Sequence, residues 1–169
     1  MAWAYISRRP IIGPNAGMIP FRLLRELHRS LAVSISAQGG DMGTIQVVDN
    51  YGALRIVAQR GFGKDFLKHF RTVRASDNSA CARAYRTASA VSIADIREDA
   101  GFAPHRGIAE AAGFRAVQSA PLVKSDGNVN GVLSVHYKAV LSKPDWRLQT
   151  LYASALRASV ILDNFATTA

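Results

Sequence analysis

The chain has 169 residues, of which 49% are hydrophobic and 20% charged, so it is long and apolar enough to form one domain with its own core. This composition excludes a disordered chain, the single cysteine Cys81 excludes an internal disulfide, and no apolar run reaches the roughly 18 residues of a membrane span. The net charge is +9, but the cations are scattered rather than gathered in blocks, which favours solvated faces over a nucleic-acid surface and leaves an anionic small ligand compatible with the charge.

The N-terminal part of the chain predicts a leader followed by a helix. Residues 1–17 include Pro10 and Pro14 and are expected to form an irregular leader ahead of a single domain over residues 18–166. From Phe21 to Ile35 apolar residues recur three and four positions apart, which is the pattern of an amphipathic helix. The pair Gly39 and Gly40 is expected to end it.

The middle of the chain alternates short strands and helices. Residues 44–48 and 54–59 predict two strands joined by a hairpin loop at residues 49–52. A short helix is expected over residues 64–70, and a second begins at a cap formed by Asp77 or Ser79 and runs to Arg86. Residues 91–93 predict a strand, residues 94–106 a long loop, and residues 108–112 a helical turn.

The C-terminal part predicts a hairpin and a final helix. Residues 116–123 and 129–137 are strongly β-like, and Asp126-Gly127 between them is a typical hairpin turn. Pro144 is expected to open the last helix. Because the strands are joined by hairpins rather than crossovers, the predicted fold class is α+β, an antiparallel sheet covered by helices.

The order of elements and several segments within it resemble the GAF domain family. The segments are Gly43–Asp49, Leu54–Phe62, Phe66–Val73, Ser79–Ala84, Val91–Asp95, Gly113–Leu122 and Gly131–Tyr137. The resemblance extends from about Phe21 to Phe165. It implies a sheet of about six strands, with the N- and C-terminal helices packed on one face and a ligand pocket on the other, as in GAF and PAS folds.

The resemblance also implies a function. We expect a cytoplasmic sensory domain in signal transduction that binds a small molecule, forms a homodimer and acts on an output protein in trans through its terminal helices. If it does not act in trans, we expect the chain to be a fragment of a larger sensor. The first alternative is a dimeric interaction module without a ligand.

Polar residues placed among apolar strand positions are the candidate ligand-binding residues. Together with neighbouring side chains they form a predicted set of eight: Phe70, Cys81, Asp95, His105, Arg115, Gln118, Ser134 and His136. In this set Arg115 is suited to clamp a carboxylate or phosphate. The competing interpretation is that these residues form the solvent-exposed face of a sheet that is covered on one side only.

No complete catalytic constellation is recognisable, so we predict that the chain is not an enzyme. Cys81 lies at the start of a predicted helix, where a thiol pKa can be lowered, and a redox sensor or enzyme dependent on Cys81 is therefore the second alternative. Family members that reduce free methionine sulfoxide rely on several cysteines, and this chain has one.

The ligand itself is not identified by the sequence. The four histidines are not spaced three or four apart, so no metal site is predicted. Haem bound through His105 or His136 is not favoured. Covalent bilin attachment typically uses a cysteine followed by histidine, whereas Ala82 follows Cys81 here, and the Asp-Glu pair of the cyclic-nucleotide members is absent.

Overall fold

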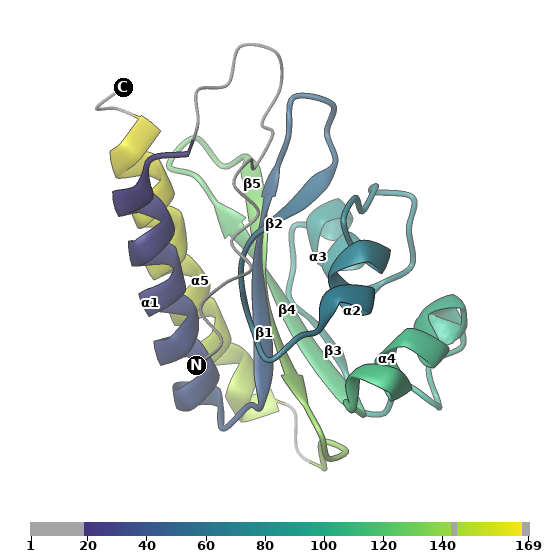
Figure 1. The fold of residues 1–169 in the computed structure, drawn as a ribbon. Helices are drawn as coiled ribbons and strands as arrows, with labels where there is room; N and C mark the ends of the chain where they lie inside the picture. The colour runs from purple at the N-terminus through teal and green to yellow at the C-terminus, as the bar shows by residue number, and fades with distance from the viewer. Residues whose placement is uncertain (1–18, 143–144, 167–169) are drawn as a thin grey trace.

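The computed structural model describes residues 19–142 and 145–166, which form a central sheet between two layers of helices (Figure 1). The predicted leader over residues 1–17 and the predicted helix start at Pro144 lie outside the described residues. The sheet has five strands in the order β2-β1-β5-β4-β3, and every neighbouring pair is antiparallel. The strands are β1 (Met42–Val48), β2 (Leu54–Arg60), β3 (Val91–Ile93), β4 (Ala116–Val123) and β5 (Val129–Tyr137).

The α+β class and the antiparallel pairing predicted from the sequence are confirmed, with five strands where about six were expected. Val73 pairs with Leu54 in an isolated bridge and does not extend into a further strand. At the centre of the sheet β1 and β5 approach closely, because a Cβ atom on Gly131 would lie against the backbone carbonyl of Gln46. Gly131 therefore permits the spacing of these two strands.

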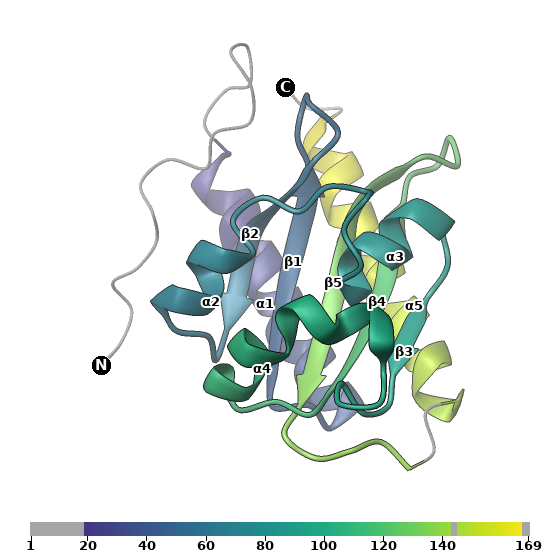
Figure 2. The ribbon, with the colours of Figure 1, turned by 90° about the vertical axis from the view of Figure 1, so that its right-hand side faces the viewer.

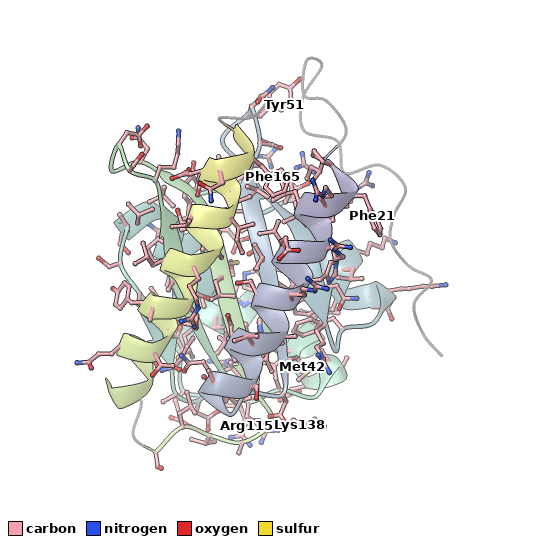
Figure 3. All side chains as sticks on the ribbon, turned by 90° about the vertical axis from the view of Figure 1, so that its left-hand side faces the viewer. Phe21, Met42, Tyr51, Arg115, Lys138 and Phe165 are labelled. Atoms are coloured by element: carbon pink, nitrogen blue, oxygen red, sulfur yellow. The ribbon has the colours of Figure 1, made fainter. Side chains whose placement is uncertain are left out.

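The terminal helices α1 (Phe21–Gln38) and α5 (Asp145–Ala166) pack side by side on one face of the sheet. They run in opposite directions, since Phe21 at the start of α1 and Phe165 near the end of α5 lie toward the same end of the molecule (Figure 3). Gly39 adopts φ 60°, and the N–H groups of Gly39 and Gly40 donate to the last carbonyls of α1, so the predicted glycine stop is a Schellman-type cap.

The opposite face of the sheet is covered by shorter helices, which we call the covering helices (Figure 2). They are α2 (Lys64–His69), α3 (Ala80–Thr87), the 3-10 helix η1 (Ala100–His105) and α4 (Arg106–Ala112). The loop predicted over residues 94–106 thus contains helical structure, since Asp99 caps η1 by accepting from the N–H of Phe102.

The sheet separates two apolar cores. Leu27, Leu31 and Leu151 belong to the core beneath the terminal helices, whereas Phe66 and Phe114 belong to the core beneath the covering helices. Each central strand contributes alternate residues to the two cores, as the period-two geometry of a strand requires.

Candidate functional site

A cavity of about 20 Å³ lies between the central strands and the covering helices. Its walls combine polar side chains of β1, β4 and β5 with aromatic rings from the covering side. A volume of roughly 10–15 Å³ is needed for one water molecule, so the cavity as it stands has room for about one. A larger ligand requires side chains of the cavity wall to move.

The sheet contributes a row of buried polar side chains that we call the polar strip: Thr44, Gln46, Ser119, Ser134 and His136. Strand register brings them together, because Ser134 pairs with Thr44 on one side and with Ser119 on the other. The hydroxyl oxygens of Ser119 and Ser134 are 2.7 Å apart and hydrogen-bonded. Polar residues therefore line the cavity at positions where an ordinary sheet core is apolar.

Two atoms of the polar strip are buried without a hydrogen-bond partner: Oε1 of Gln46 and Nδ1 of His136. Burial lowers the pKa of His136 to about 3, so its imidazole is neutral at physiological pH. Gln46 pairs with Val132, four positions from His136 along β5, which separates the two backbones by about 13 Å. The unpartnered atoms thus belong to opposite ends of the polar strip.

Aromatic rings form the opposing wall. Phe66 and Phe70 come from α2 and the residue after it, Phe102 from η1, and Phe114 from the segment that leads into β4. The ring centroids of Phe114 and His136 lie 4.7 Å apart in an edge-to-face arrangement. A planar ligand would meet apolar rings on this side and hydrogen-bonding groups on the sheet side.

Cys81 lines the cavity as a buried thiol rather than a reactive one. Burial raises its pKa to about 11, although a contact with the hydroxyl of Ser79 at 3.3 Å acts in the other direction. The effect of the helix start expected from the sequence is outweighed, because a buried thiolate loses its hydration.

Asp77 links three of the segments around the cavity. Its Oδ1 accepts from the N–H of Ser79 at 2.7 Å, ahead of α3, and lies 3.0 Å from Nε2 of His105 at the end of η1. Nδ1 of His105 is in turn 3.0 Å from Nε2 of His69 on α2. Burial raises the pKa of Asp77, but hydrogen bonds from Ser79 and the nearby His105 outweigh it, so the carboxyl pKa lies below its ordinary value.

Arginines fix the segment that carries η1 and α4. Arg83 of α3 forms a two-pronged ion pair with Asp99 at 2.8 and 2.6 Å, and this hydrogen-bonded pair lowers the pKa of the carboxyl. Arg106 donates to the backbone carbonyls of Ile96 and Asp99. These bonds close the covering side without placing a cation in the cavity wall.

Four of the eight predicted site residues line the cavity: Phe70, Cys81, Ser134 and His136. His105 does not line it but lies behind Phe70 and Phe102, with ring centroids 5.3 and 5.4 Å away.

Three predicted residues lie elsewhere. Arg115 donates to both oxygens of Asp95 at 3.2 and 2.5 Å, so its guanidinium holds the covering loop instead of extending into the cavity. Gln118 lies on the opposite face of β4, where it accepts from the hydroxyl of Tyr137 at 2.8 Å. It alternates with Ser119, which faces the cavity, and the strand period therefore excludes it.

Sequence reasoning missed Thr44, Gln46 and Ser119 as cavity residues. The signal was present in β1, where Thr44 and Gln46 alternate with Ile45 and Val47. Assigning that polar face to the cavity required the register between β1 and β5, which the sequence does not specify.

Within residues 19–142 and 145–166, no group of three or more histidine, cysteine, aspartate or glutamate residues is arranged to hold a metal ion. None of the helices in the described part of the chain is long and apolar enough to cross a membrane.

Comparison with known proteins gives a family match. A family model described as the GAF domain matches residues 22–160. No match was found among curated proteins.

Similar solved structures agree with this fold. A GAF domain region from Geobacter sulfurreducens has a TM-score of 0.72 at 17% identity, covering 84% of this chain and 93% of that one. Free methionine-R-sulfoxide reductase from Neisseria meningitidis, solved with its substrate, has a TM-score of 0.72 at 18% identity and covers 87% and 81%. The blue-light absorbing form of the Thermosynechococcus elongatus PixJ GAF domain has a TM-score of 0.66 at 15% identity and covers 89% and 92%.

Proposed function

The chain belongs to the GAF domain family, and on that premise we propose that it is a sensory or regulatory domain that binds a small molecule in the cavity beneath the covering helices. GAF domains typically bind small molecules and regulate other activities. The observation that carries the proposal for this chain is the pair of unpartnered buried atoms, Oε1 of Gln46 and Nδ1 of His136, lining one cavity.

Unpartnered polar atoms are costly in a protein core. Each such group destabilises the folded state by about 1–3 kcal/mol relative to a satisfied one. A ligand that bonds to these atoms recovers part of that free energy on binding. The polar strip is thus better suited to a ligand than to a dry core.

Binding would be coupled to movement of the covering helices. The cavity has room for about one water molecule, so a metabolite must displace part of the aromatic wall. The contacts that oppose this movement are the Asp77–His105–His69 hydrogen bonds and the Arg83–Asp99 ion pair. Ligand binding and the position of these helices are therefore thermodynamically coupled.

The two alternatives differ in how they account for Cys81 and the cavity. A redox role needs an accessible thiol of low pKa, whereas burial raises the pKa of Cys81 to about 11. The similarity to the methionine sulfoxide reductase, at 18% identity, concerns the fold. A ligand-free interaction module remains the competing function, and the experiment below separates the two.

The terminal helices are the proposed route to a partner and to a homodimer. Tyr152, Leu156 and Val160 form an exposed stripe along α5, at spacings of four, and 63% of the surface of Leu156 is exposed. Burying such a stripe against a second copy is favourable. Leu156→Glu should convert a dimer to a monomer in sedimentation experiments, whereas a wild-type chain that sediments as a monomer would contradict the dimer.

Native mass spectrometry of freshly purified protein tests the ligand proposal. We expect an additional mass that is lost on denaturation, and we expect Gln46→Met to reduce its occupancy. Gln118→Met, the same substitution on the opposite face of the sheet, is the matched control and should retain the additional mass in the folded fraction. A bare chain mass in the wild type, together with no thermal stabilisation by a metabolite library, would favour the ligand-free module.

A further inference from the structure

We infer that the cavity selects an uncharged, planar ligand with an N–H or O–H group that donates to Oε1 of Gln46, and that it rejects the anionic and cationic analogues of that ligand. This inference rests on the proposed function, because it names the ligand class of the same cavity. It is notable for a chain with a net charge of +9, where an anionic ligand would be the simple expectation.

The walls of the cavity contain no lysine, arginine, aspartate or glutamate among the residues that the structure describes. Two arginines that lie close in the chain to cavity-lining residues, Arg83 near Cys81 and Arg115 beside Phe114, are already in ion pairs. Arg83 is paired with Asp99, and Arg115 is paired with Asp95. A buried anion would therefore have no counter-charge, and an uncompensated buried charge is strongly disfavoured.

Histidine does not supply the missing positive charge. His136 is buried among aromatic rings, with Phe62 and Phe114 at centroid distances of 4.9 and 4.7 Å. Burial keeps its imidazole neutral. Its ring offers a hydrogen bond to a ligand and no ionic attraction.

The start of α3 is the one remaining feature of the wall that would attract an anion, since helix N-termini carry partial positive charge. The carboxylate of Asp77 lies beside that position, since its Oδ1 accepts from the N–H of Ser79, the residue before α3. A second negative charge beside Asp77 would be repelled. The helix start therefore does not make the cavity an anion site.

The same walls favour a planar donor. Phe66, Phe102 and Phe114 present apolar rings, which suit an aromatic ligand. On the sheet side the acceptor Oε1 of Gln46 has no partner within the protein. A carboxamide or ring N–H satisfies this acceptor.

Three isosteric compounds test the charge preference: benzamide, benzoate and benzamidinium, which share one skeleton and carry charges of 0, −1 and +1 at pH 7.5. Binding to the full chain is measured by ligand-observed NMR and by amide chemical-shift changes. We expect benzamide to bind at least about tenfold more tightly than either charged compound. We expect Gln46→Met to weaken benzamide binding by about tenfold, the amount that corresponds to about 1.4 kcal/mol, with Gln118→Met as the control that leaves it unchanged.

The outcomes separate this inference from the proposed function. Tighter binding of benzoate or benzamidinium would overturn the inference on ligand class and leave a ligand-binding cavity standing. Equal loss of benzamide binding in Gln46→Met and Gln118→Met would overturn the role of the Gln46 acceptor. Binding of none of the three compounds at millimolar concentration would overturn the inference, and the native mass measurement would then decide independently whether the cavity holds a ligand.

Discussion

Acidification should destabilise this protein through His136, well above the pH at which carboxylates protonate. Burial holds the pKa of His136 at about 3 in the folded chain, against an ordinary value of 6.5. Between these values the unfolded chain binds a proton that the folded chain does not, so stability falls as the pH falls. The slope approaches about 1.4 kcal/mol per pH unit only below pH 6.5, where the unfolded histidine is half protonated, so the loss between pH 6.5 and 4.5 is about 2.3 kcal/mol.

Urea unfolding followed by circular dichroism at pH 7.5, 6.5, 5.5 and 4.5 measures this loss. For a chain of this size an m-value of about 2 kcal/mol per molar converts about 2.3 kcal/mol into a midpoint shift of about 1.2 M. The titration stops at pH 4.5 because carboxyls such as Asp77, with an ordinary pKa of 3.8 lowered further in the fold, begin to contribute below that range.

Comparison with His136→Gln isolates the contribution of this one histidine. The variant should lose most of the pH dependence whatever its stability at pH 7.5. His28→Gln is the control: His28 on α1 is far less buried than His136, although desolvation also lowers its pKa, so its removal should change the slope less. Parallel pH dependence in the wild type and His136→Gln would refute the argument that His136 is buried and neutral.

Three further predictions concern the cavity and its cover. In urea unfolding, Gln46→Met should leave the free energy of unfolding unchanged or raise it by about 1 kcal/mol, because it removes an unpartnered oxygen. Gln118→Met should lower it by about 1–3 kcal/mol, because it breaks existing hydrogen bonds such as that from Tyr137. Equal losses in the two variants would contradict this. Gly101→Ala places a methyl group against the guanidinium that holds η1 and should increase amide exchange in the covering helices, while Gly107→Ala has open space and should not. Cys81 should react with Ellman's reagent at pH 8 about 100-fold more slowly than a thiol of pKa 9.0. A rapid reaction would instead support the redox alternative.

Much of the fold could be predicted because the decisive signals are local. Asp126-Gly127 placed a turn between two alternating runs, and the strands there match the expected residues 116–123 and 129–137. The apolar period from Phe21 and the glycine after Gln38 likewise defined α1. Such patterns depend on residues within one element, so a single sequence contains them.

Only half of the predicted site residues line the cavity, because its lining depends on the register between strands and on which charged side chains pair with each other. Alternation alone indicated that Ser134 and His136 share a face, but Gln118 could be excluded only once Ser119 was seen to pair with Ser134. Arg115 was a sound candidate for an anion clamp until Asp95 was found beside it. Both outcomes are decided by residues more than ten positions away in the chain.

The alternation of β5 has a mechanical consequence. Ser134 and His136 face the cavity, and the residues between and beside them, Leu133, Val135 and Tyr137, lie in the core beneath the terminal helices. A displacement of β5 at its polar residues also displaces the side chains that pack against α1 and α5, since both helices contact this strand. Under the proposed function, signal transfer needs no relay of side chains, since the strand that lines the cavity is itself in contact with the terminal helices.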